Sequence, residues 1–119
     1  MADQEIETAQ LLLSNDRHRA CISRAYYAMY YATQALLRAK KIASRTHKGM
    51  IQQFGQHFVK TGEFPSKTAK ELSDNYNLRQ LSDYEETIAV NEAQAAQALE
   101  TAVRFVEQVR VYLNENDRT

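Results

Sequence analysis

The chain has 119 residues, of which 44% are hydrophobic and 25% are charged. This composition is typical of one folded globular domain and is too apolar for an intrinsically disordered chain. Its 15 Lys and Arg residues balance its 15 Asp and Glu residues, so the formal net charge is zero. We expect a single domain over residues 1–119, with a core from about residue 5 to residue 113.

The cysteine count and the N-terminus exclude several classes of protein. Cys21 is the single cysteine, so no internal disulfide can form, and no Cys and His cluster has the spacing of a zinc site. Residues 1–15 contain acidic side chains, unlike a signal peptide, and no run approaches the ~18–20 apolar residues of a membrane span. We therefore expect a cytoplasmic protein with no metal, no cofactor and no membrane contact.

Helical periodicity dominates the chain, which has only three glycines and one proline to form turns. The pattern predicts five helices, at about residues 2–14, 17–39, 47–58, 66–83 and 91–113. At near 1.5 Å per residue, the second is long enough to be the central rod of a bundle. The predicted fold is all-α, an up-and-down helical bundle of four to five helices.

Capping and turn residues support these boundaries. A loop covers about Lys40 to Thr46, and Gly62 and Pro65 mark the turn before the fourth helix. Asn91 and Gln94 have the spacing of a capping box, in which each side chain bonds the backbone of the other residue. The last helix should therefore begin at this pair.

The second helix holds the densest chemistry of the chain. It carries Ser23-Arg24-Ala25-Tyr26-Tyr27-Ala28-Met29-Tyr30-Tyr31, with four of the seven tyrosines. A stripe of small residues allows another helix to approach closely; its members are Cys21, Ala25, Ala28, Ala32 and Ala35. We expect Arg24 and these tyrosines to be core or dimer-interface residues whose hydroxyls form buried hydrogen bonds. A base-stacking surface is the alternative.

The charges of the chain are unevenly distributed. Between Asp16 and Glu63 there is no acidic residue, but there are nine Lys or Arg residues and all three histidines. Such segregation indicates an anionic partner. The candidate RNA- or nucleotide-binding residues are Lys40, Lys41, Arg45, His47 and Lys48; the alternative is a solvated basic loop.

His47 stands out within this basic segment. It lies at a predicted helix start beside Lys48 and two residues after Arg45, where backbone N–H groups and cations can bind a phosphate. Its ordinary pKa range also suits proton transfer. The alternative is a capping or surface residue.

A second polar group lies on the fourth helix. Tyr76, Arg79 and Asp83 share one face, and Tyr84 follows immediately. Arg79 and Asp83 form either a surface ion pair worth about 0.3 kcal/mol or part of a cleft in which Arg79 binds a phosphate and Asp83 orients its guanidinium. The tentative catalytic residues are Arg79, Asp83 and Tyr84.

Several short segments of the chain form one pattern. They are Asn15-Asp16 leading to Ala20, Ser23-Arg24-Ala25-Tyr26-Tyr27-Ala28-Met29, Thr46-His47-Lys48-Gly49, Phe54-Gly55, His57-Phe58-Val59-Lys60-Thr61-Gly62, Leu78-Arg79-Gln80 and Asp83-Tyr84. Together they resemble the HEPN superfamily, and within it one small branch of helical domains often encoded beside minimal nucleotidyltransferases. The resemblance covers about residues 5–113.

This resemblance implies a homodimer and two alternative functions. In many HEPN proteins a dimer cleaves RNA without metal, using an Arg followed four to six residues later by a His. Arg79 matches that arginine, but Tyr84, Glu85 and Glu86 stand where the histidine would lie. The first hypothesis is therefore an RNA- or nucleotide-binding protein that acts with a minimal nucleotidyltransferase in a toxin–antitoxin-like system. Exposed tyrosines or Tyr84 would then be nucleotidylation targets.

The alternative hypothesis is a metal-independent endoribonuclease. It would use Arg79 with Asp83, Tyr84 or His47. The sequence thus suggests a cleft between the Arg38–Lys48 segment and the fourth helix.

Overall fold

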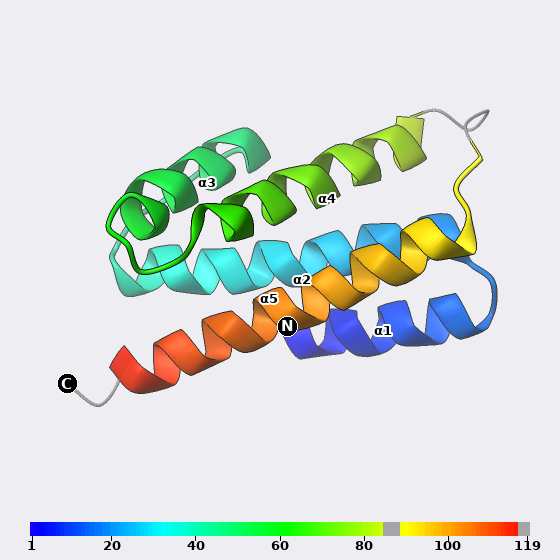
Figure 1. Cartoon of the computed structure of the whole chain (residues 1–119), viewed down its shortest axis with the longest axis horizontal. Helices are drawn as coiled ribbons and strands as arrows, with labels where there is room; N and C mark the ends of the chain where they lie inside the picture. Colours follow the sequence, from blue (N-terminus) through cyan, green and yellow to red (C-terminus); the bar gives the residue numbers. More distant parts are fainter. Residues whose placement is uncertain (85–88, 117–119) are drawn as a thin grey trace.

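The computed structural model describes residues 1–84 and 89–116, without the side chain of Tyr84, and in this part of the chain every regular element is helical. The elements are α1 (Ala2–Ser14), α2 (His18–Ala39), α3 (His47–Phe54), a π-helical turn η1 (Gly55–Val59), α4 (Ser66–Tyr84) and α5 (Glu92–Asn116). Helices α1 and α4 run in one direction and α2 and α5 in the other (Figure 1). The predicted all-α bundle is confirmed.

Helix α2 is central, because it packs against α1, α3, α4 and α5. Four of the five residues of its small-residue stripe are buried, all but Ala35, and so is a matching set of small residues on α5: Cys21, Ala25, Ala28 and Ala32 on α2, and Ala95, Ala98 and Ala102 on α5. The Cys21 thiol lies 3.9 Å from the Ala95 carbonyl oxygen. Small side chains on both helices allow their backbones to approach closely.

Phenylalanines join α3, η1 and α5 at one end of the bundle. Phe54 lies 5.9 Å from Phe58, 5.4 Å from Phe64 and 5.8 Å from Phe105, measured between ring centroids. All four rings are buried. This aromatic core fixes α3 against the rest of the bundle.

The third helix is less regular than the sequence predicts. We expect one α-helix over residues 47–58, but the helix widens at Gly55 into η1, where the Lys60 N–H donates to the Gly55 carbonyl at 3.0 Å. The wider turn leaves Phe54 and Phe58 stacked at an interplanar angle of 21°. We attribute the switch from α-helix to π-helical turn to the packing of these two rings.

The start of the last helix agrees with the sequence. The Gln94 N–H donates to Asn91 Oδ1 at 2.8 Å, and the Asn91 N–H donates to Gln94 Oε1 at 3.0 Å. These two bonds form the predicted capping box. No helix in the described part of the chain is long and apolar enough to cross a bilayer.

Replacing Phe54 by alanine should destabilise the protein by about 3–5 kcal/mol, because a fully buried ring leaves a cavity among three aromatic neighbours. Urea unfolding followed by circular dichroism measures this loss. Val111→Ala is the control, since Val111 is 46% exposed and its truncation should change stability by less than about 0.5 kcal/mol. Equal losses in the two variants would contradict the assigned core.

Candidate functional site

A cluster of aromatic and basic side chains lies where α2, the start of α3 and α4 meet. We call it the tyrosine–arginine cluster; its members are Tyr26, Tyr27, Tyr30, His47, Tyr76 and Arg79. The centroid of the His47 ring lies 5.8 Å from that of Tyr76, and the Arg79 guanidinium carbon lies 5.9 Å from the same Tyr76 ring. The structure therefore brings together two residues, His47 and Arg79, that are 32 positions apart in the chain.

The Arg79 guanidinium is enclosed by rings. Its carbon lies 5.4 Å from the ring centroids of both Tyr26 and Tyr27, within the range of cation–π attraction. Nη1 donates to the Tyr27 hydroxyl at 3.3 Å and to Asp83 at 3.1 Å. The side chain is 13% exposed, and its Nε is buried without a hydrogen-bond partner among the described residues. Arg79 is thus fixed in place, and its buried Nε–H has no acceptor among the described residues.

His47 is positioned by the cap of α3. It is the first residue of that helix, and the Thr46 side chain caps the helix by accepting the Gly49 N–H at 2.9 Å. A Cβ atom at position 49 would lie 2.8 Å from Thr46 Oγ1, so glycine leaves room for the cap. The Thr46-His47-Lys48-Gly49 segment therefore fixes the backbone from which the imidazole projects.

The His47 imidazole is itself surrounded by tyrosines. Its Nδ1 lies 2.6 Å from the Tyr26 hydroxyl, its ring centroid lies 4.9 Å from that of Tyr30, and it stacks on Tyr76 at 20°. Burial lowers the pKa of His47, and the positive charge of Arg79 lowers it further. The imidazole is therefore mainly neutral at pH 7.

The remaining residues of the α2 motif occupy several environments. Tyr26 is fully buried, whereas Arg24, Tyr27, Tyr30 and Tyr31 are half-buried. The Arg24 guanidinium carbon lies 4.9 Å from the Tyr27 ring centroid, and Nη1 donates to Glu5 of α1 at 3.0 Å. The Tyr27 ring is thus in contact with two guanidinium groups, those of Arg24 and Arg79.

A hollow of about 450 Å³ is lined by residues of α1, α2 and α4, none of which belongs to the cluster itself. Its lining includes Ser23, Arg24 and Asp83. Arg24 and Asp83 contact the cluster members Tyr27 and Arg79, so the hollow provides space for a ligand beside the cluster. The side chain of Tyr84, the third tentative catalytic residue, lies outside the described part of the structure.

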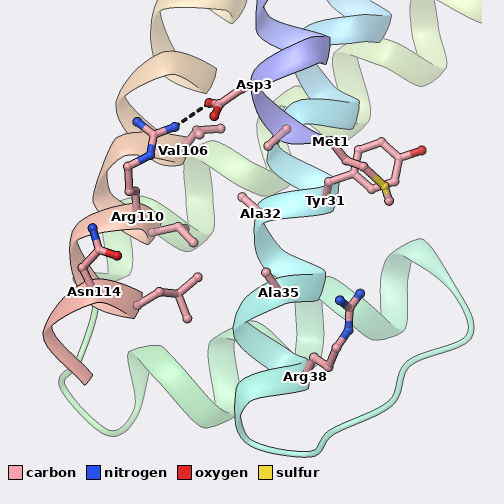
Figure 2. A pocket seen from close by; sticks show the side chains of 12 residues that line it. Met1, Asp3, Tyr31, Ala32, Ala35, Arg38, Val106, Arg110 and Asn114 are labelled. Atoms are coloured by element: carbon pink, nitrogen blue, oxygen red, sulfur yellow. Dashed lines mark hydrogen bonds and ion pairs between the residues drawn. The ribbon is translucent and has the colours of Figure 1, made fainter. Parts of the chain in front are cut away.

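A second groove has a different character. It has a volume of about 400 Å³ and lies between α2 and α5 beyond the N-terminus of α1, with Tyr31 and Arg38 on one side (Figure 2). Arg110 on the other side pairs with Asp3 (Figure 2). No described lining residue of this groove forms a hydrogen bond, ion pair or ring contact with His47 or Arg79, whereas Asp83 of the first hollow pairs with Arg79. We therefore place the candidate site at the cluster.

The five candidate RNA-binding residues separate into three groups. Lys40 donates to the His57 carbonyl and to Glu63, and its ammonium lies 4.2 Å from the Phe58 ring centroid, so it joins α2 to the segment after α3. His47 belongs to the cluster. Lys41, Arg45 and Lys48 are exposed, and their side chains form no hydrogen bond or ion pair among the described residues.

One cluster member was not among the candidate site residues. Tyr76 supplies a ring to both His47 and Arg79, and its hydroxyl accepts from Gln80 at 2.9 Å. Its spacing of three residues from Arg79 was the available signal, because residues at i and i+3 lie on the same helix face.

An all-α, up-and-down helical bundle is the fold that the HEPN resemblance implies. The family model of the HEPN domain matches residues 1–112. The chain therefore belongs to the HEPN family.

Individual relatives agree with this assignment. Two proteins of Methanocaldococcus jannaschii, named "Putative toxin MJ0142" and "Putative toxin MJ0605", are 30% and 31% identical to this chain over 99% and 97% of its length, and 85% of each relative is covered. The UPF0332 protein glr0978 of Gloeobacter violaceus is 33% identical over 90% of this chain and 91% of its own. The matches extend over nearly the whole helical bundle.

The Lys40 contact leads to a prediction about stability and pH. Burial alone would raise the pKa of Glu63, but the hydrogen bonds from Lys40, Tyr112 and Thr61, together with the Lys40 charge, lower it below its usual 4.5. A carboxylate whose pKa falls on folding stabilises the native state above about pH 4.5, and this contribution is lost as the pH falls through the folded-state pKa. Glu63→Gln should therefore be less stable than the wild type at pH 7.

Urea unfolding of both proteins at pH 7 and at pH 3.5–4 tests this prediction. The wild type should lose more stability on acidification than Glu63→Gln loses. Glu100→Gln is the matched control, because Glu100 is an exposed carboxylate paired with Arg104 on the same helix and surface pairs contribute little. The same pH dependence in wild type and Glu63→Gln would contradict the assignment.

Proposed function

We propose that this HEPN protein is the toxin-like half of a two-component system, binds RNA or a nucleotide at the tyrosine–arginine cluster and acts with a minimal nucleotidyltransferase. One observation carries the binding proposal. Arg79 Nε is a buried donor with no partner in the described residues, and it lies beside a histidine in an aromatic setting. Buried donors in folded proteins nearly always have an acceptor.

Phosphate is the acceptor that best fits these donors. Guanidinium groups form strong, charge-assisted hydrogen bonds to phosphate oxygens, and Arg79 is already fixed by three rings and by Asp83. The start of α3 lies at the same place and adds backbone N–H groups that favour an anion. The adjoining hollow of about 450 Å³ offers room for the ligand.

The aromatic rings support a nucleic acid or nucleotide rather than a bare anion. Tyr27 and Tyr30 are half-buried members of the cluster, so part of each ring faces outward. Unstacked bases of single-stranded RNA stack on such rings. The exposed Lys41, Arg45 and Lys48 would add attraction to the phosphate backbone that does not depend on base sequence.

The rest of the proposal draws on the family. Two relatives carry the word toxin in their names, and the resemblance within the superfamily implies a homodimer and a nucleotidyltransferase partner. Nucleotidylation needs a reachable hydroxyl. Tyr26 is fully buried, so Tyr27, Tyr30, Tyr31 and Tyr84 are the candidate targets.

A second candidate function is metal-independent RNA cleavage. The observation that favours it is the position of His47, which contacts the same rings as Arg79 although the motif position after Arg79 lacks a histidine. A mainly neutral imidazole beside a fixed guanidinium can serve acid–base chemistry while the guanidinium binds the phosphate. Asp83 would orient Arg79 in this reaction.

Replacing Arg79 by alanine should weaken RNA binding by at least about tenfold, since a charge-assisted hydrogen bond contributes about 1.5–3 kcal/mol. Filter retention of labelled single-stranded RNA in EDTA measures the change, and gel analysis of the same samples detects cleavage. Lys70→Ala is the matched control, because it removes a cation from an exposed position of the same helix.

The same experiment separates the two functions. Retention of intact RNA by the wild type supports the binding function and excludes the ribonuclease function. Cleavage that is lost in both Arg79→Ala and His47→Ala supports the ribonuclease. Retention that is unchanged in Arg79→Ala contradicts the proposed site.

The exposed bases give a prediction about salt. Changing Lys41, Arg45 and Lys48 together to glutamine should weaken retention and reduce the slope of log affinity against log salt by about 2, if each contacts one phosphate of a single strand. Filter retention between about 50 and 200 mM salt measures the slope. The control triple variant changes Lys60, Lys67 and Lys70, which are also exposed. Equal slopes in the two triple variants would rule out a contribution of Lys41, Arg45 and Lys48 to RNA binding.

A further inference from the structure

The hydroxyl of Tyr26 is an unusual feature of the cluster. The residue is fully buried, and within the described part of the chain its hydroxyl contacts one polar atom, Nδ1 of His47 at 2.6 Å. Burial raises the pKa of Tyr26, so its hydroxyl keeps the proton. The remaining question for this contact is which of the two groups donates.

Hydrogen-bond accounting favours the tyrosine as donor. A neutral imidazole carries its proton on one ring nitrogen, and the other nitrogen accepts. If Nδ1 carried the proton, it would donate to the Tyr26 oxygen, and the buried hydroxyl proton would have no acceptor. If Tyr26 donates to Nδ1, both groups are satisfied, and unsatisfied buried polar groups are costly. The proton of the imidazole then lies on Nε2.

The other nitrogen of the ring is available to a ligand. Nε2 of His47 forms no hydrogen bond among the described residues, and it is not one of the buried polar atoms without a partner, which are His18 Nε2, Ser44 Oγ and Arg79 Nε. It therefore reaches the surface of the site. Stacking on Tyr76 and contact with Tyr30 restrict rotation of the ring.

We propose that Tyr26 is a positioning residue that fixes the tautomer of His47, so that the imidazole presents Nε2–H as a hydrogen-bond donor to the bound ligand. The choice of ligand rests on the proposed function. Arg79 Nε and His47 Nε2–H are then both donors, and the site selects a ligand with several acceptor oxygens, such as a phosphodiester or a nucleotide phosphate.

The tautomer also constrains any cleavage reaction. A neutral imidazole with its proton on Nε2 and with Nδ1 occupied begins the reaction as a hydrogen-bond donor to a phosphoryl oxygen, because giving up that proton would leave an imidazolate. It cannot begin by removing a proton through Nε2. If the protein cleaves RNA, His47 would therefore stabilise charge on the phosphate through Nε2–H, and other groups would have to accept the proton of the attacking hydroxyl and protonate the leaving oxygen.

Two-bond ¹H–¹⁵N NMR correlation spectra of the histidine side chains test the inference on the full chain. In the wild type at pH 7.5, His47 should show a protonated Nε2 and an unprotonated, hydrogen-bonded Nδ1. In Tyr26→Phe the ratio of the Nε2–H to the Nδ1–H form should fall by about fivefold, because one hydrogen bond to Nδ1 is lost. Tyr76→Phe is the matched control, since the Tyr76 hydroxyl accepts from Gln80 and its loss should leave the ratio unchanged.

The outcomes separate this inference from the proposed function. A wild-type spectrum with the proton on Nδ1 overturns the inference, even if Tyr26→Phe fails to fold. The same tautomer ratio in Tyr26→Phe and the wild type also overturns it. RNA retention is measured on the same samples, and its absence from a wild type with the expected tautomer contradicts the proposed function but supports the assignment of Tyr26.

Discussion

Close packing of α2 against α5 is the constraint on which the rest of the structure depends. The small residues Cys21, Ala25 and Ala28 are fully buried on the side of α2 that carries the stripe, which allows the close approach. With small residues on this side, Tyr26, Tyr27 and Tyr30 of α2 lie on its other sides, toward α3 and α4. Asn75 of α4 donates to the Ala98 carbonyl at 3.2 Å, so α4 is fastened to the same pair of helices. The site is assembled around a helix whose position is fixed by its smallest side chains.

The sequence was sufficient for the helices because their signals are local. Apolar periodicity and the Asn91–Gln94 capping box need only neighbouring residues, and the structure places the helices close to the predicted bounds. The π-helical turn at Gly55 could not be predicted in this way. It depends on how Phe54 and Phe58 pack with Phe64 and Phe105, which come from later in the chain.

The same distinction between local signals and long-range packing applies to the candidate site. The Arg79–Asp83 pair follows from a spacing of four residues on one helix. The meeting of His47 with Arg79 depends on how α3 and α4 pack against α2, so the sequence alone could only include it among several options. For Lys40, the local sequence pattern leads to a prediction that the folded structure does not bear out. Its basic segment predicts anion binding, but its partner Glu63 follows the acid-free segment and becomes a neighbour only in the folded chain.

The acid-free segment therefore contains several kinds of cation. Arg24 and Lys40 are paired with Glu5 and Glu63, which come from the acidic parts of the chain on either side. Their charges are balanced within the fold and contribute little to attraction of an anion at a distance. Six exposed cations of the segment have no ion-pair partner among the described residues, and three of these, at positions 41, 45 and 48, flank His47 in the chain. In the proposed function they would provide salt-dependent affinity, whereas the fixed donors of the cluster would position the phosphate. On this view the charge segregation of the sequence reflects two separate requirements, helix packing and ligand attraction, and only the second requires that the cations stay unpaired.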